Sequence, residues 1–188
     1  MKTFLSLIAV GLLLTGAGCR QQAPGLPLTN DVEVPEVTQE RMFTSVDLGS
    51  DVFNLEFTIP ANMDVEYIPS LEALNIFSLD GDGSTRDRSM IFIRYFDASQ
   101  FLTLSSVNVY ETVETTVGRE GYTARRYDIE KKSNVPDFVD QPDWRNLRHY
   151  VTDFRGSDGH TRYFVVAANP ALDPAVYEAV LASMKIVK

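Results

Sequence analysis

Hydrophobic and polar residues alternate along most of the chain after residue 50, the pattern of β-strands with one buried face. Residues 53–60 read FNLEFTIP, in which every second side chain is aromatic or aliphatic. We expect Pro60 to end this strand, because proline cannot donate to a sheet. After a turn at Ala61 and Asn62, the alternation resumes in MDVEYIP. Residues 88–98, RSMIFIRYFDA, are mostly apolar on both faces and predict a central strand.

Three hairpins are predicted to join successive strands. The first turns at DGDG, residues 80–83, between a strand that begins at Ala73 and the central strand. The second turns between Gly118 and Gly121. The third covers residues 147–168 around RGSDG. Successive hairpins predict an antiparallel sheet.

Charge pairing suggests a register for the third hairpin. If Asp153 lies opposite Arg162, that pair is charge-complementary, and Val151 then lies opposite Phe164 as an apolar pair. Each such cross-strand pair contributes about 0.2–1 kcal/mol. The sequence therefore predicts this register.

The end of the chain has a helical pattern instead. Asp173 fits the N-cap position and Pro174 the first helical position. Such a start predicts a helix whose apolar stripe covers the sheet. The stripe consists of Val176, Tyr177, Val180, Leu181 and Met184.

The beginning of the chain has the pattern of an export leader. Lys2 supplies a positive charge, and residues 4–14 read FLSLIAVGLLL. This run is too short to cross a bilayer, which takes about 20 apolar residues. Small residues follow at positions 15–18, and then comes Cys19, the only cysteine of the chain.

This arrangement resembles the leader of bacterial lipoproteins. The resemblance implies that residues 1–18 are a signal peptide and that Cys19 carries the lipid, including acyl chains such as palmitate, as the first residue of the mature chain. Since Arg20 rather than aspartate follows, the family's sorting rule implies the periplasmic face of the outer membrane if the source has two membranes. The alternative is an ordinary secretory leader cut near Ala17.

Composition then divides the mature chain. Residues 19–41 are predicted to be a flexible tether, because residues 20–39 contain three prolines and no periodicity. One globular domain is expected over residues 42–188. The chain has 17 basic and 26 acidic residues and a net charge of −9, which argues against nucleic acid as a partner. Anionic lipid would repel the domain, so the lipid on Cys19 would hold it to the membrane.

The order of elements resembles the Mog1/PsbP-like family. The resemblance is carried by FTIPANM, GREGY, RYFVVAANP and LASMKIV, spread over residues 53–187. It implies an α+β fold in which an antiparallel sheet is sandwiched by helices, with the C-terminal helix packed on the sheet. It also implies a non-catalytic role, because known members act as binding or accessory proteins.

Few residues point to chemistry. Asp80, Asp82 and Asp87 lie in a glycine-containing loop, but the later glutamate of a calcium loop is missing, so we interpret them as a solvated hairpin loop. We expect no metal site and no cofactor. The only histidines, His149 and His160, would lie about 20 Å apart in the predicted hairpin. No nucleophile-elbow motif is present, and we do not expect an enzyme.

Residues 131–146 look like an insertion before the last hairpin. Phe138, Val139 and Trp144 lie there among acidic residues, and apolar side chains on an ordered loop are typical contact anchors. These three residues are therefore a possible partner contact. The alternative is that Trp144 folds back to cover one end of the sheet.

These observations predict a membrane-anchored lipoprotein that acts as a non-catalytic binding or accessory module for another protein of the cell envelope. The second hypothesis is a small-ligand carrier with a pocket between the sheet and the C-terminal helix, and the third is a hydrolase built around His149. A carrier requires a cavity lined by aromatic residues. An accessory module requires a filled core and an exposed apolar patch.

Overall fold

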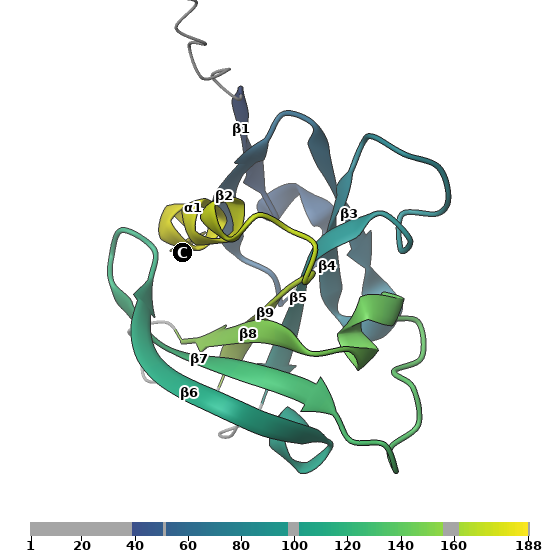
Figure 1. Ribbon diagram of the computed structural model, residues 1–188. Helices are drawn as coiled ribbons and strands as arrows, with labels where there is room; N and C mark the ends of the chain where they lie inside the picture. The colour runs from purple at the N-terminus through teal and green to yellow at the C-terminus, as the bar shows by residue number, and fades with distance from the viewer. Residues whose placement is uncertain (1–38, 51, 98–101, 156–161, 188) are drawn as a thin grey trace, which may run out of the picture. The chain divides into compact units, whose positions relative to one another are not determined.

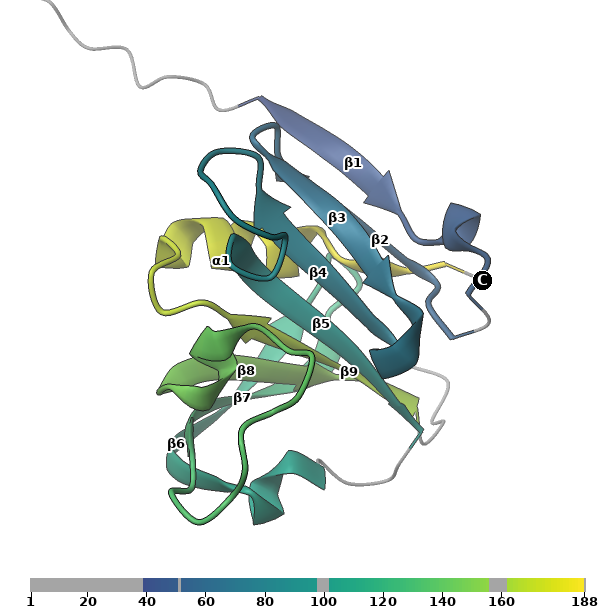
Figure 2. The same cartoon turned by 90° about the vertical axis from the view of Figure 1, so that its right-hand side faces the viewer.

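The computed structural model describes residues 39–50, 52–97, 102–155 and 162–187 (Figure 1). All of them belong to the second of the two units into which the chain divides, Met1–Glu36 and Val37–Lys188. Within the described residues, ten strands form two antiparallel sheets, and one α-helix lies near the C-terminus (Figures 1 and 2).

The small sheet has three strands in the order β1-β2-β10, and the large sheet has seven in the order β3-β4-β5-β9-β8-β7-β6. The strands of the small sheet are β1 (Glu40–Thr44), β2 (Leu55–Pro60) and β10 (Lys185–Ile186). The strands of the large sheet are β3 (Met63–Ile68), β4 (Ala73–Ser78), β5 (Ser89–Asp97), β6 (Val107–Val117), β7 (Tyr122–Lys131), β8 (His149–Phe154) and β9 (Arg162–Ala168). The helix is α1 (Pro174–Ser183), and the 3₁₀ turns are η1 (Val46–Leu48), η2 (Pro69–Leu71), η3 (Leu102–Ser105) and η4 (Asp143–Asn146).

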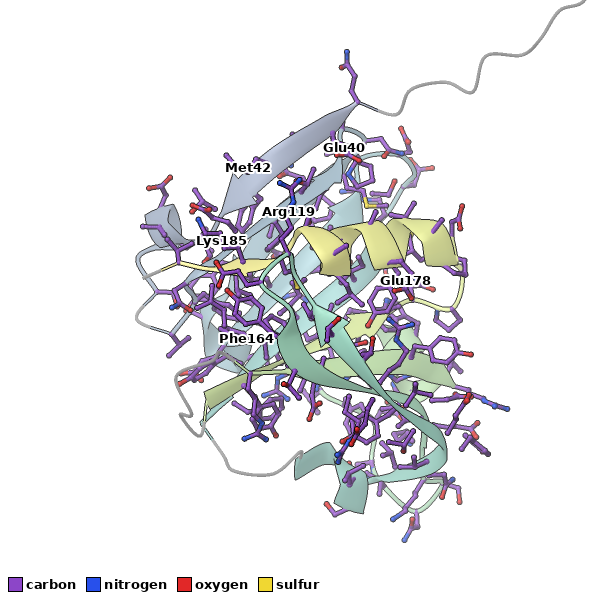
Figure 3. All side chains as sticks on the ribbon, turned by 90° about the vertical axis from the view of Figure 1, so that its left-hand side faces the viewer. Glu40, Met42, Arg119, Phe164, Glu178 and Lys185 are labelled. Carbon is purple, nitrogen blue, oxygen red and sulfur yellow. The ribbon has the colours of Figure 1, made fainter. Side chains whose placement is uncertain are left out.

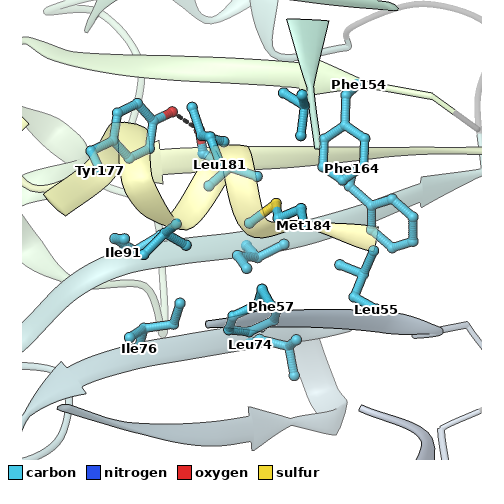
Figure 4. Packing of buried hydrophobic residues seen from close by; sticks show 14 of the residues in the cluster. Leu55, Phe57, Leu74, Ile76, Ile91, Phe154, Phe164, Tyr177, Leu181 and Met184 are labelled. Carbon is cyan, nitrogen blue, oxygen red and sulfur yellow. Dashed lines mark hydrogen bonds between the residues drawn. The ribbon is translucent and has the colours of Figure 1, made fainter. Parts of the chain in front are cut away.

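The alternation predicted for residues 53–60 is confirmed in β2. Leu55, Phe57 and Ile59 are buried, the side chains between them are half-exposed, and the strand ends at the predicted proline. Figure 4 shows Leu55 and Phe57 packed in one cluster with Leu74 and Ile76 of the large sheet. We call the face of the large sheet that carries this cluster the inner face.

The predicted C-terminal helix is confirmed as α1. Asp173 Oδ1 accepts a hydrogen bond of 2.8 Å from the backbone N–H of Ala175, and Pro174 occupies the first turn. Tyr177 and Leu181 are buried in the inner cluster (Figure 4). The helix and the small sheet therefore cover the inner face together.

The opposite, outer face of the large sheet carries a second apolar cluster. Residues 131–146 run over this face (Figure 2). Trp144 of η4 packs into the cluster with only 7% of its surface exposed. An irregular segment, rather than a helix, thus covers the outer face. The buried members are Ile68, Ala73, Phe92, Val107, Tyr127, Ile129, Trp144, Val151, Tyr163, Val165 and Ala167.

The predicted α+β fold, a single sheet sandwiched by helices as in the Mog1/PsbP-like family, is wrong. The fold is β-rich, with two sheets and, among the described residues, a single α-helix of ten residues. The physical reason lies in the hydrophobic period. It is two along most of the chain, and β2 buries its apolar face by forming a sheet of its own with β1 and β10.

The hairpins at DGDG and at Gly118–Gly121 are confirmed, with β4 paired to β5 and β6 paired to β7. Gly118 and Gly121 have φ angles of 72° and 68°, in the left-handed region that glycine adopts readily. The prediction of a central strand is also confirmed, because β5 lies between β4 and β9.

The register predicted for the third hairpin is wrong. Phe154 lies opposite Phe164 and Asp153 lies opposite Val165, while Arg162 pairs with Asp97 of β5. The observed register differs from the predicted one by three residues. Because side chains alternate between the two faces and three is odd, Val151 and Phe164 lie on opposite faces of the sheet and not on the same one. The observed register brings the rings of Phe154 and Phe164 to 5.4 Å within the inner cluster, and burial of two aromatic rings outweighs a single charge pair.

The small sheet begins inside the stretch assigned to the tether. Glu40 and Arg41 belong to β1, where they lie opposite Pro60 and Ile59. The Arg41 guanidinium also donates a hydrogen bond of 2.8 Å to the carbonyl oxygen of Met63. Residues 19–38 of the predicted tether and the signal peptide lie outside the described residues.

Candidate binding groove

Two adjoining hollows form an open groove where α1, the small sheet and the tip of the β6–β7 hairpin meet (Figure 3). Their volumes are about 420 and 350 Å³. Thr58 of β2, Ser183 at the end of α1 and Arg119 at the hairpin tip line both hollows. The groove therefore continues from one hollow into the other beneath Arg119.

Small apolar residues form the helical wall of the groove. The buried side of α1 carries its large residues, so Ala175, Ala179 and Ala182 are left on the side that faces the first hollow. All three are exposed. Pro60 contributes to the opposite wall from β2. Short side chains let a bound molecule come close to the helix.

Ser183 fastens the end of α1 to β2. Its hydroxyl oxygen accepts a hydrogen bond of 2.9 Å from the backbone N–H of Thr58, and its hydroxyl donates one of 2.8 Å to the carbonyl oxygen of Val180. The Ser183 hydroxyl thus gives the Thr58 N–H an acceptor that β10 does not supply, because β10 pairs only with residues 55 and 56 of β2. The wall and the floor of the groove are thus joined.

Gly118 fastens the hairpin tip to the same end of the helix. Its N–H donates a hydrogen bond of 2.9 Å to the carbonyl oxygen of Leu181. A Cβ atom at this position would lie 2.2 Å from the carbonyl oxygen of Met184, so only glycine allows the approach. The close contact positions the next residue, Arg119, over the groove.

Among the described residues, the carboxylates along the groove, including Glu40 of the first hollow, form no ion pair with Arg119. Lys185 pairs with Glu56 at 3.7 Å, and Glu120 accepts a hydrogen bond of 2.7 Å from the Tyr122 hydroxyl. Burial, and then the bond to Glu120, raise the pKa of Tyr122. Arg119 is exposed and forms no ion pair with any residue that the structure describes. Its guanidinium is available to a carboxylate of a bound molecule.

The predicted contact residues lie away from this groove. Trp144 is buried in the outer cluster and Phe138 is half-buried against it, whereas Val139 is 76% exposed. The Phe138 N–H donates a hydrogen bond of 3.1 Å to Asn146 Oδ1, which links two parts of the same segment. Trp144 covers the sheet, as the alternative interpretation expected, and only Val139 projects into solvent. The predicted lipid-attachment residue, Cys19, lies outside the described residues.

The acidic hairpin loop uses its carboxylates internally. Asp87 Oδ2 accepts hydrogen bonds of 2.8 Å from both the backbone N–H and the hydroxyl of Ser84, and these bonds lower the pKa of Asp87. Asp80 Oδ2 accepts one of 3.4 Å from Asn62. Asp82 is exposed. No cluster of three potential metal ligands occurs in the described part of the chain.

His149 is buried in an environment that disfavours its protonated form. Its Nδ1 lies 2.7 Å from the carbonyl oxygen of Leu147, and its Nε2 contacts the Arg145 guanidinium. Burial, and then the charge of Arg145, lower the pKa of His149 to about 3. The ring is therefore neutral, with Nδ1–H donating and Nε2 accepting. The other histidine, His160, lies outside the described residues.

Comparison with family models, curated proteins and solved structures finds no match for the chain. Among the described residues, no helix combines the length and the apolar character needed to span a bilayer.

The groove was not predicted from the sequence. The spacing of Ala175, Ala179 and Ala182 is a signal that the chain does carry, because residues three and four apart share one side of a helix. The placement of Arg119 has no such local signal. It depends on the contact between Gly118 and the end of α1, which are more than 60 residues apart in the chain.

Proposed function

We propose that the chain is a lipid-anchored protein of the cell envelope whose β-rich domain is a non-catalytic binding module. The proposed partner is an extended segment of another envelope protein, with small or aliphatic side chains and one carboxylate. The observation that carries this proposal is the open groove, in which an exposed alanine wall lies beside Arg119, an arginine that forms no ion pair with the described residues.

Each part of the groove supports an extended peptide as the occupant. A wall of alanines admits a peptide backbone, and the two hollows in succession suit a chain rather than a compact molecule. A carboxylate at Arg119 would form a charge-assisted hydrogen bond, the stronger kind of polar contact. The residues beneath the groove belong to the buried core, since Val180 and Met184 are 1% exposed.

Site-specific photocrosslinking in the native membrane tests this function. A photoreactive residue in place of Ala179 should capture one partner protein, and mass spectrometry should map the bound segment to an extended stretch with an acidic residue. Capture should be lost when Arg119→Glu is combined with it, because the two carboxylates would repel. The matched control places the photoreactive residue at Thr112, which is exposed on β6. Equal capture from both positions, insensitive to Arg119→Glu, would refute the groove as the binding site.

The anchor is tested separately. The chain should sediment with membranes, and the Cys19→Ser variant should appear in the soluble fraction, because stable anchoring depends on more than one acyl chain and the variant has none. Mass spectrometry of the mature N-terminal peptide should show an acylated cysteine. An unmodified peptide that begins at residue 18 would instead support the ordinary secretory leader.

A small-ligand carrier remains the second candidate function. The first hollow lies between β2 and α1, and its volume of about 420 Å³ falls within the usual range of small-molecule sites. None of its lining residues is aromatic, unlike the cavity that a carrier was expected to have. Native mass spectrometry of the purified protein distinguishes the two functions. A carrier would retain a small molecule that Ala179→Trp displaces, whereas a peptide-binding module would show the mass of the protein alone.

A further inference from the structure

A concentration of positive charge lies on the outer face of the large sheet, away from the groove. Arg145 of η4 is 4% exposed, although arginine is rarely buried without a carboxylate. Arg94 of β5 is half-buried on the same face, because its neighbours Ile93 and Tyr95 point into the inner cluster. The Arg94 guanidinium lies over the ring of Phe96, which packs against the same outer cluster as Trp144. Burial, and then the charge of Arg94, lower the pKa of Arg145.

The partners of Arg145 carry no negative charge. Its Nε donates a long hydrogen bond of 3.4 Å to Gln141 Oε1, and its Nη1 contacts Nε2 of the neutral His149. Its Nη2 donates to no described residue. No carboxylate of the described residues lies within ion-pair distance of this guanidinium.

Two further N–H groups nearby are buried without an acceptor. They are the Nε of Arg94 and the indole Nε1 of Trp144. The Arg94 guanidinium lies over the ring of Phe96, 4.7 Å from its centre, and the Arg145 guanidinium lies 5.9 Å from the Trp144 ring. Glu72 attracts Arg94 electrostatically but is exposed and forms no ion pair with it. Among the described residues, the site thus offers donors and cations and no negatively charged partner for them.

Such a cluster is unfavourable unless something supplies negative charge. Both a buried charge without a partner and a buried N–H without an acceptor destabilise the fold. An anion with several oxygens would relieve both costs at once. Guanidinium groups bind carboxylate and phosphate oxygens in pairs, which makes these the matching ligands.

We infer that the outer face holds a binding site for a small oxyanion, a phosphate or a carboxylate, formed by Arg94, Arg145 and the indole N–H of Trp144. The half-exposed Arg94 forms the solvent side of the site and the buried Arg145 its inner side. Gln141 and His149 hold Arg145 in place through its Nε and its Nη1. This site is independent of the groove and of the proposed peptide partner.

Isothermal titration calorimetry of the full domain with inorganic phosphate, and separately with acetate, tests the inference at neutral pH and fixed ionic strength. At least one anion should bind saturably with a stoichiometry of one. Binding of phosphate alone would assign a phosphate group to the ligand, and binding of acetate alone would assign a carboxylate. The absence of saturable binding by both would overturn the inference.

Two conservative variants identify the site. Trp144→Phe keeps an aromatic ring in the outer cluster and removes the indole N–H, and Arg94→Gln removes one charge from the solvent side. Each should weaken anion binding by about tenfold or more, as expected for a hydrogen bond to a charged group. The matched control is Arg125→Gln, since Arg125 is an exposed arginine that pairs with Glu114 at 3.2 Å. Unchanged affinity in both variants, or an equal loss in the control, would refute the site. Circular dichroism and the melting temperature confirm that each variant is folded.

Discussion

Replacing His149 with glutamine should make the folded protein less sensitive to acid. His149 is 4% exposed and is held between the Leu147 carbonyl oxygen and the Arg145 guanidinium. Burial, and then the charge of Arg145, lower its pKa from the ordinary 6.5 to about 3. A proton on Nε2 would face the guanidinium directly, so the folded protein keeps the ring neutral. The unfolded chain imposes no such restriction.

The sign and size of the effect follow from this difference in pKa. Below pH 6.5 the unfolded chain binds a proton that the folded protein does not, so the free energy of unfolding falls as the pH falls from 6.5 towards 3. Between about pH 7 and about pH 4.5, this one group removes about 2.5 kcal/mol of stability. The glutamine side chain does not titrate, and its amide oxygen can still accept a hydrogen bond from Arg145.

Urea denaturation, followed by circular dichroism at about pH 7 and about pH 4.5, measures the effect in both chains. Carboxyl groups whose pKa is lowered in the fold, such as those of Asp64 and Glu66, also reduce stability in acid. They are present in both chains, so their contribution cancels when the two losses are subtracted. The wild type should lose about 2.5 kcal/mol more than His149→Gln. Equal losses would refute a neutral, buried His149.

Three further substitutions test the structure elsewhere. In urea denaturation, Gly118→Ala should destabilise the protein by about 2 kcal/mol more than Gly121→Ala. Both positions have positive φ, but only at Gly118 would a Cβ lie 2.2 Å from a carbonyl oxygen. Equal losses of stability would contradict this close contact. Trp144→Ala should lower the free energy of unfolding by about 3–5 kcal/mol, because the side chain is a buried aromatic. The control Val139→Ala, at an exposed position, should lower it by less than about 1 kcal/mol. A small loss at both positions would show that the tryptophan does not cover the sheet. Asp173→Ala should lower the free energy of unfolding by about 1 kcal/mol through loss of the N-cap, as measured by thermal unfolding. Unchanged stability would refute the capping role of Asp173.

Local features of the sequence were sufficient to predict most of the individual elements. The alternation in β2, the turn after Pro60 and the start of α1 at Asp173 each depend on a few neighbouring residues. Glycines with positive φ marked the β6–β7 turn for the same reason. Such features follow from steric limits on the backbone and from the period of the side chains, which act within one element.

The candidate sites could be predicted only in part. The sequence identified Trp144 as important but left open whether it binds a partner or covers the sheet, because a single chain position carries no information on burial. Its burial depends on an outer face built from β5, β7, β8 and β9. The contact between Arg145 and His149 joins residues only four apart, yet its chemical effect, a neutral histidine, comes from burial under that face.

The sequence by itself determined most of the strands, the turns and the helix, although β1 begins in the predicted tether and β10 was not predicted. It also carries the leader pattern that ends at Cys19. Only the tertiary structure decided the arrangement of the strands in two sheets, the register of β8 against β9 and the groove beside α1. The reason is that register and layering depend on which faces are buried together. Phe154 meets Phe164 because both fill a cluster that also contains residues of β2 and α1, far away in the chain. A local charge pair cannot compete with that shared burial.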